Sequence, residues 1–169
     1  MATAMDWERA FARQGRADLE TFEKMQLQEF SIPVCHMLQF LQMACEKLAK
    51  AYLCGTGSDP TVLQTSHAYV AKTLPIVIRE QADHVNLGSQ KTEGLVKRAR
   101  HLFQEIEMLA PAVKRGGKRP DNCEYPWADD TETVHVPLDW TFHPAKFISD
   151  HAGRTILKLV KGAFARTLE

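Results

Sequence analysis

The sequence lacks a long apolar run, and it lacks an excess of charge of either sign. No segment approaches the roughly 18 consecutive apolar residues that a membrane-spanning helix requires. Basic and acidic residues number 21 each, so a generally cationic protein is excluded and any nucleic-acid site must be a local patch. The first 16 residues are rich in charge and have no apolar core, which argues against a secretory signal. We therefore expect a cytoplasmic protein that makes no membrane contact.

Cysteine is scarce, and no two cysteines are spaced as a metal or redox motif. The sequence has four, Cys35, Cys45, Cys54 and Cys123, and three of them fall in one apolar helical stretch, where a thiol acts as a small buried hydrophobe. A metal site or a redox role is the alternative. The seven histidines are scattered, and the sequence shows no phosphate-binding loop, nucleophile elbow or dinucleotide fingerprint. We predict neither a metal nor a cofactor.

The composition is that of a globular domain, and its apolar residues follow a helical period. With 169 residues, 44% hydrophobic and 25% charged, the chain is long enough for one core and one domain, 1–169. The clearest stripe contains Leu38, Leu41, Cys45, Leu48 and Tyr52. It predicts a helix after Ser31, with Pro33 in its first turn, that ends near Gly55. Further helices are expected over 6–13, 18–30, 66–81 (kinked or split at Pro75), 95–110 and 144–167. The fold class is all-α, a bundle of four to five helices.

A long irregular insertion, residues 112–142, precedes the last helix. It opens on a Gly116-Gly117 turn, contains several prolines, and includes a short alternating stretch, 131–136. This pattern predicts a surface excursion with at most a small β-hairpin. Loops of such length in compact domains are usually functional or mobile.

Positive charge is concentrated just before and within this insertion. The polar side of the helix over 95–110 carries Lys97, Arg98, Arg100 and His101, and the insertion adds Lys114, Arg115, Lys118 and Arg119. Such a cluster produces a local positive potential suited to phosphate or RNA. The alternative is a solvated helix face followed by a basic loop.

The segment from Arg119 to Trp127 is the densest group of distinctive side chains. Arg119 is suited to clamp a phosphate, Asn122 to orient a hydroxyl or a phosphate oxygen, and Glu124 to act as a general base. Tyr125 and Trp127 are suited to stack on a base or to cap the core. In the alternative interpretation, this segment only pins the loop onto the bundle.

Glu46 and Lys50 are four residues apart on the strongest predicted helix. Residues at this spacing pair on a helix surface, and a surface ion pair is the simpler interpretation. The alternative is that both side chains point into a groove beside the Arg119 segment and support its site.

Three segments together resemble HEPN domains. The stretch LQMACEKLAKAYL, residues 41–53, is similar to the family's central helix, which has an apolar stretch followed by E-K-x-x-K-A. Tyr125-Pro126 is similar to the family's R-Y-P segment, and Ser66-His67-Ala68 resembles the opening of its middle helix. The resemblance extends over about residues 18–168.

The resemblance implies a HEPN-like bundle that forms a homodimer, in a prokaryotic toxin–antitoxin or phage-defence setting with an antitoxin or defence protein as a partner. Many members are metal-independent ribonucleases with an R-x(4–6)-H motif, in which Arg binds phosphate and His assists attack by the RNA 2′-hydroxyl; others only bind RNA or nucleotides. Here Arg119 occupies the Arg position, and Glu124 stands where the His is expected.

We therefore expect a module that binds RNA or a nucleotide at a dimer cleft; the alternative is an active endoribonuclease with Glu in place of His. The candidate catalytic residues are Arg119, Asn122, Glu124 and Tyr125. The phosphate-binding candidates are Lys97, Arg98, Arg100, Lys114, Arg115 and Lys118, and the supporting residues are Glu46 and Lys50.

Overall fold

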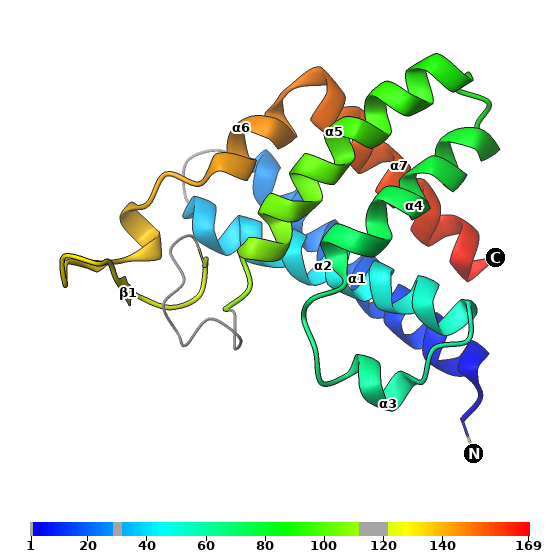
Figure 1. The fold of residues 1–169 in the computed structure, drawn as a ribbon, viewed down its shortest axis with the longest axis horizontal. Coiled ribbons are helices and arrows are strands. Elements are labelled where there is room, and N and C mark those ends of the chain that lie inside the picture. Colours follow the sequence, from blue (N-terminus) through cyan, green and yellow to red (C-terminus); the bar gives the residue numbers. More distant parts are fainter. Residues whose placement is uncertain (1, 29–31, 112–121) are drawn as a thin grey trace.

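The computed structural model describes residues 2–28, 32–111 and 122–169, which are mainly helical with one small antiparallel hairpin (Figure 1). In chain order the elements are α1 (Ala4–Leu27), α2 (Val34–Gly55), α3 (Pro60–Leu63), α4 (Val70–His84), α5 (Ser89–Met108), β1 (Trp127–Ala128), β2 (Val134–His135), the 3-10 turn η2 (Pro137–Asp139), α6 (His143–Ser149) and α7 (His151–Leu168). The predicted all-α bundle with a small hairpin is confirmed.

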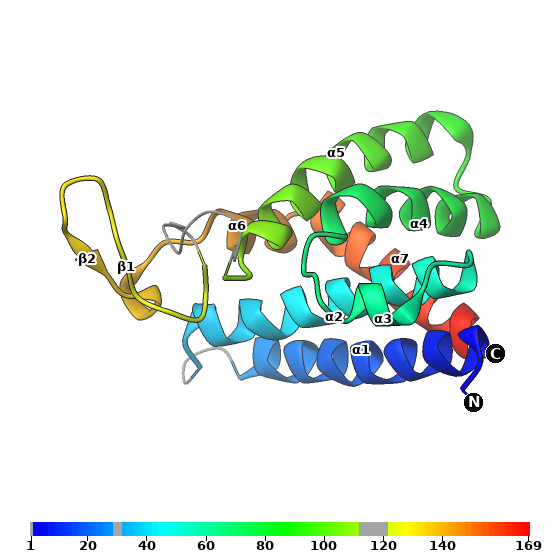
Figure 2. The ribbon, with the colours of Figure 1, turned by 60° about the horizontal axis from the view of Figure 1, so that its bottom comes forward.

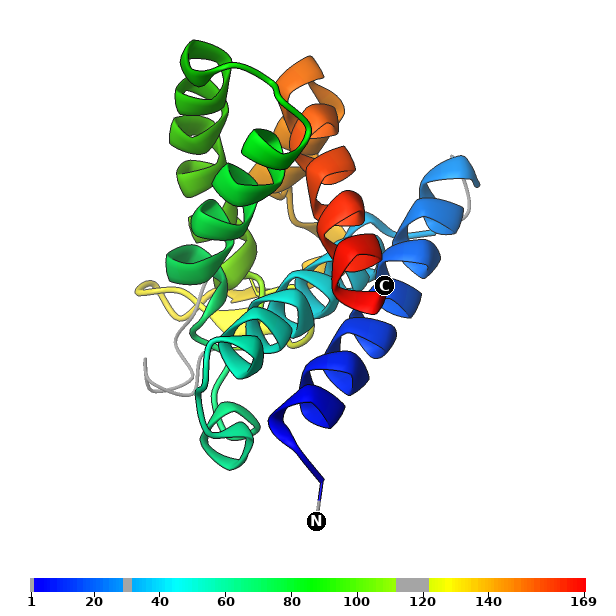
Figure 3. The ribbon, with the colours of Figure 1, turned by 90° about the vertical axis from the view of Figure 1, so that its right-hand side faces the viewer.

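The bundle consists of two antiparallel helix pairs and a helix between them. Helices α1 and α2 lie side by side along most of their length, and α4 and α5 form the second pair above them (Figure 2). Helix α7 packs against both α1 and α4 and so joins the two pairs (Figure 3). No helix of the described segments is long and apolar enough to cross a bilayer.

The predicted stripe on α2 is confirmed as part of the core. Leu38, Leu41, Cys45 and Leu48 are at most 1% exposed, and Tyr52 packs against the core while partly accessible. Because the helical period places these side chains on one side of α2, that side can be covered by its neighbours while other positions are free for polar groups.

The predicted break between two N-terminal helices, 6–13 and 18–30, is wrong, because α1 is continuous. Gly15 is tolerated in mid-helix since α7 and α2 approach it closely: a Cβ there would lie 2.8 Å from the Phe164 ring and 2.9 Å from the Cβ of Lys47. Asp18, which looked like a helix start, instead pairs with Lys47 at 2.6 Å. Tertiary contacts therefore hold the two segments in one helix.

The starts of α2 and α4 also differ from the prediction. Pro33 is the N-cap of α2 and lies outside its first turn, while Ser31 lies outside the described residues. Helix α4 begins at Val70, so that His67 belongs to the preceding loop. Pro75 is buried within α4 and does not split the helix. Burial of its ring against the core offsets the hydrogen bond that a proline cannot donate.

The single helix expected over 144–167 is two helices, α6 and α7, that meet at Asp150. The Asp150 carboxylate accepts a hydrogen bond of 2.7 Å from the backbone N–H of Gly153 and so caps α7. Gly153 is required at this corner, since a Cβ there would overlap the carbonyl oxygen of Phe147. The side-chain cap and the close backbone approach together turn the chain.

The described part of the insertion contains the hairpin of β1 and β2, in which Trp127 pairs with His135. The hairpin projects from one end of the bundle (Figure 2). Its base is fixed by Trp127, which is buried and packs edge-on against Trp140 with 5.1 Å between ring centroids. This confirms that the insertion holds at most a small hairpin in its described part.

Candidate functional site

Glu46 is the centre of a polar cluster set into the otherwise apolar helix α2. Its side chain is 10% exposed and accepts hydrogen bonds from Lys50 Nζ at 2.6 Å and from Gln42 Nε2 at 3.0 Å. The spacing of four residues places these three side chains on one face of α2. The interpretation of Glu46 and Lys50 as a surface pair is wrong, because the Lys50 side chain is only 6% exposed.

A third contact reaches Glu46 from the loop between α3 and α4. Nδ1 of His67 lies 2.8 Å from Oε2 of Glu46, although the two residues are 21 positions apart. The ring of His67 is 55% exposed, and among the described residues its Nε2 has no hydrogen-bond partner. The carboxylate therefore holds one ring nitrogen of a side chain that is half exposed.

The electrostatics of Glu46 favour its ionised form. Burial alone would raise the pKa of this carboxyl, but hydrogen bonds from Lys50, His67 and Gln42 together hold it below its usual range. Removing a Glu–Lys pair from water carries a desolvation cost that the attraction between the charges often only balances. The ion pair therefore adds little net stability to the fold. Ionisable groups with shifted pKa values cluster at functional sites, which makes this pair a candidate for a functional role.

The loop that carries His67 has one hydrogen bond from α5 at its end and one within itself. The Glu107 carboxylate of α5 accepts a hydrogen bond of 2.8 Å from the backbone N–H of Ala71 in the first turn of α4. In the loop itself, the hydroxyl of Ser66 accepts one of 3.3 Å from the N–H of Ala68. Helix α5 therefore fixes the start of α4 three residues after His67.

Glu124 lies within electrostatic range of this cluster. Burial raises the pKa of its carboxyl, the charge of Glu46 raises it further, and His67 acts in the opposite direction. The segment is tied to the end of α5 by a hydrogen bond of 3.0 Å from the N–H of Cys123 to the carbonyl of Leu109. Glu124 is thus influenced by the charge of Glu46, another residue singled out in the sequence.

Asn122 shapes the turn that presents Glu124. It is buried, and its Oδ1 accepts hydrogen bonds from the backbone N–H groups of Glu124 at 3.1 Å and Tyr125 at 2.7 Å. Such a side-chain turn fixes the local backbone. Tyr125 is 60% exposed, so it is accessible for stacking, whereas Trp127 is buried and packs against His135 and Trp140.

The cationic face of α5 is exposed, and two of its residues are committed to contacts within the chain. Arg98 pairs with Asp150 at 3.2 Å, and the ring of His101 packs edge-on against Phe147. Lys97 and Arg100 have no ion-pair partner among the described residues. The other predicted cations, Lys114, Arg115, Lys118 and Arg119, lie outside the described residues.

The free cations of α5 and the Glu46 cluster are related by the helical period. Arg100 lies seven residues before Glu107, which is two turns along the same face of α5 and a rise of about 10 Å. Glu107 contacts the first turn of α4, just after His67. The line that runs through Arg100 therefore leads along α5 toward the start of α4, and Lys97 lies about 60° around the helix from Arg100.

The four cysteines are free, buried thiols, as the apolar pattern around three of them indicated. Burial raises the pKa of Cys45 far above its ordinary value, and burial together with the charge of Glu124 raises that of Cys123 to about 12. Within the described ranges, no group of three or more His, Cys, Asp and Glu side chains is placed to hold a metal ion.

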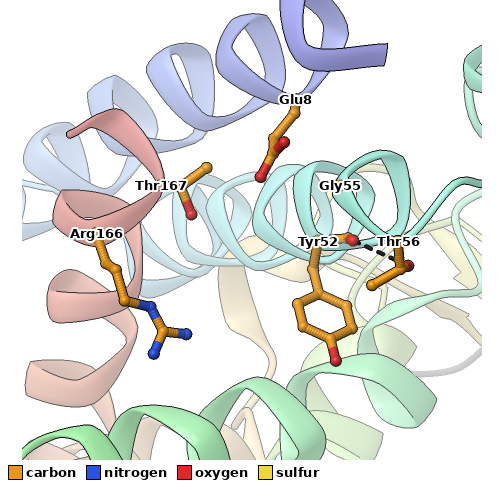
Figure 4. Close-up of a pocket in the computed structure, with 6 residues that line it drawn as sticks. All are labelled: Glu8, Tyr52, Gly55, Thr56, Arg166 and Thr167. Atoms are coloured by element: carbon orange, nitrogen blue, oxygen red, sulfur yellow. Dashed lines mark hydrogen bonds between the residues drawn. The ribbon is translucent and has the colours of Figure 1, made fainter.

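A separate pocket of about 260 Å³ lies where α1 begins and where α2 and α7 end (Figure 4). It is lined by Glu8, Tyr52, Gly55, Thr56, Arg166 and Thr167. Two of its polar groups already have partners, because the Tyr52 hydroxyl donates to Glu80 at 2.7 Å and Arg166 lies 3.7 Å from the same carboxylate. Of its lining residues, Tyr52 alone belongs to a pattern noted in the sequence, the apolar stripe of α2.

The sequence analysis missed His67 as a contact of Glu46 and noted it only within the family resemblance. The signal that could have directed attention to the site is the spacing of Gln42, Glu46 and Lys50, three polar residues on one face of a strongly apolar helix. Comparison of the chain with protein-family models, with curated proteins and with solved structures gives no match.

Proposed function

We propose that this protein is a HEPN-like module that binds RNA or a nucleotide at a cleft between two copies of the chain, in a prokaryotic defence or toxin–antitoxin setting. The observation that supports binding is the pair of exposed cations without described partners, Lys97 and Arg100, on α5, the helix whose last turn contacts the start of α4. Phosphate groups bind such cations with release of counterions. The exposed ring of Tyr125 adds a surface on which a base can stack.

The test is the binding of a fluorescently labelled single-stranded RNA, measured by anisotropy between 50 and 200 mM salt. The double variant Lys97→Ala/Arg100→Ala is expected to weaken binding and to reduce the slope of log affinity against log salt by about 1.4, for two phosphate contacts to a single strand. The control is Arg13→Ala/Lys24→Ala, which removes one arginine and one lysine from exposed positions of α1, on the opposite side of the bundle (Figure 2).

Equal effects of the two double variants would contradict a site on α5, and an affinity that does not change with salt would contradict phosphate binding altogether. The solution mass, measured by light scattering, tests the cleft between two copies. A monomer at concentrations well above the affinity for RNA would refute that part of the proposal.

A second candidate function is a metal-independent endoribonuclease. The specific observation in its favour is the contact between the ionised Glu46 and His67, because an imidazole oriented by a carboxylate is suited to proton transfer. It is tested by incubating labelled RNA with the protein in excess EDTA. Cleavage under these conditions would support it, and intact RNA at saturating protein would refute it.

A further inference from the structure

The contact between His67 and Glu46 has the arrangement of an oriented acid–base group. Imidazole changes charge between pH 5 and 8, which suits it to both accept and release a proton. When a carboxylate accepts the proton of Nδ1, the lone pair of the neutral ring is on Nε2. In this protein, Nδ1 is the nitrogen at Glu46, and Nε2 is the one without a described partner on a half-exposed ring.

The surroundings of Glu46 maintain this orientation. Lys50 and Gln42 contact the carboxylate from within α2, so that its position is fixed without His67. The His67 loop is held in turn by the contact of Glu107 with the start of α4. A half-exposed imidazole is thus held against a buried ion pair.

We infer that His67 is the catalytic proton acceptor of this site and that Glu46 is the positioning residue that orients it. The inference rests on the proposed ribonuclease function. Within the sequence pattern, Glu124 occupies the place where a histidine is expected, whereas the structure sets the imidazole of His67 2.8 Å from Glu46. The imidazole would then be supplied by the loop before α4 instead of by the segment that follows Arg119.

The reaction requires no metal and no redox partner. The 2′-hydroxyl of a ribose gives its proton to Nε2 of His67 while its oxygen forms a bond to the adjacent phosphorus. The bond from that phosphorus to the 5′-oxygen of the next nucleotide breaks, and a proton from solvent neutralises the leaving oxygen. The imidazolium then returns its proton to solvent, which leaves a 2′,3′-cyclic phosphate and a free 5′-hydroxyl.

The experiment measures binding and cleavage of one labelled RNA in excess EDTA, for the wild type and three variants. His67→Ala is expected to lower cleavage by about 100-fold or more, the usual contribution of a general base, and to change the affinity less than about twofold. Glu46→Gln is expected to lower kcat with little change in KM. The matched control is His84→Ala, which removes an exposed histidine at the far end of α4 and is expected to behave as wild type.

Added imidazole separates a chemical role of His67 from a structural one. Because the ring is half exposed, imidazole can reach the site in His67→Ala and is expected to restore part of the cleavage. Circular dichroism establishes that each variant is folded. Lost cleavage without rescue in a folded His67→Ala protein would refute proton transfer by His67.

The remaining outcomes distinguish failure of this inference from failure of the proposed function. RNA cleavage that is unchanged in His67→Ala would overturn the role of His67 and leave the ribonuclease in place. RNA binding by the wild type without cleavage would overturn the inference and leave the binding module. Neither binding nor cleavage would overturn both.

Discussion

Replacing Lys50 with methionine would leave the Glu46 carboxylate buried without its cation. The two side chains are 6% and 10% exposed, and 2.6 Å separates Nζ from Oε1. Breaking a buried pair by removing one partner costs about 3–5 kcal/mol, because the remaining charge stays desolvated. Glu46 keeps hydrogen bonds from Gln42 and His67 in this variant, so we expect the free energy of unfolding to fall by about 3 kcal/mol, the lower end of that range.

The double variant Glu46→Gln/Lys50→Met removes both charges and serves as the internal control. Replacing a whole buried ion pair by less polar groups is often neutral, so the double variant should be more stable than Lys50→Met alone. The assay is urea unfolding followed by circular dichroism at pH 7. A Lys50→Met protein as stable as the wild type would refute the reasoning, since it would mean that Glu46 is adequately solvated without Lys50.

The same pair predicts how stability depends on pH. The pKa of Glu46 is lowered on folding, so its carboxylate contributes stability above the unfolded value of about 4.3, and this contribution is lost as the pH falls through the folded value. The difference in unfolding free energy between wild type and Glu46→Gln should therefore shrink below about pH 4. A difference that stays constant from pH 7 to pH 3 would contradict this assignment.

Two further predictions concern packing. Gly15→Ala should lower stability by about 1–3 kcal/mol, because the new Cβ would press on the Phe164 ring. Gly94→Ala, at an exposed position of α5 with open space around it, should raise stability by about 0.4–1 kcal/mol. Thermal unfolding of both variants tests this, and equal shifts would contradict it. The four cysteine thiols are at most 3% exposed and should react with Ellman's reagent at pH 8 only after denaturant is added; rapid reaction of any thiol in the native protein would contradict its burial.

The helices of the chain could be predicted because the spacing of apolar residues within a single segment indicates a helix. The stripe on α2 from Leu38 to Leu48 needs only the period of the α-helix and the tendency of apolar side chains to leave water. Breaks between helices were harder to predict. The continuity of α1 through Gly15 depends on contacts from α7 and α2, and the corner at Asp150 depends on a cap and on a close backbone approach.

The candidate site shows the same division. The sequence alone determined that Glu46 and Lys50 lie one helical turn apart and can pair, because that spacing follows from helix geometry. Only the tertiary structure decided that the pair is buried, since burial depends on which elements cover that face of α2. It also decided that His67, 21 residues away, contacts Glu46, because the spacing of residues in the sequence does not specify how the chain folds back on itself.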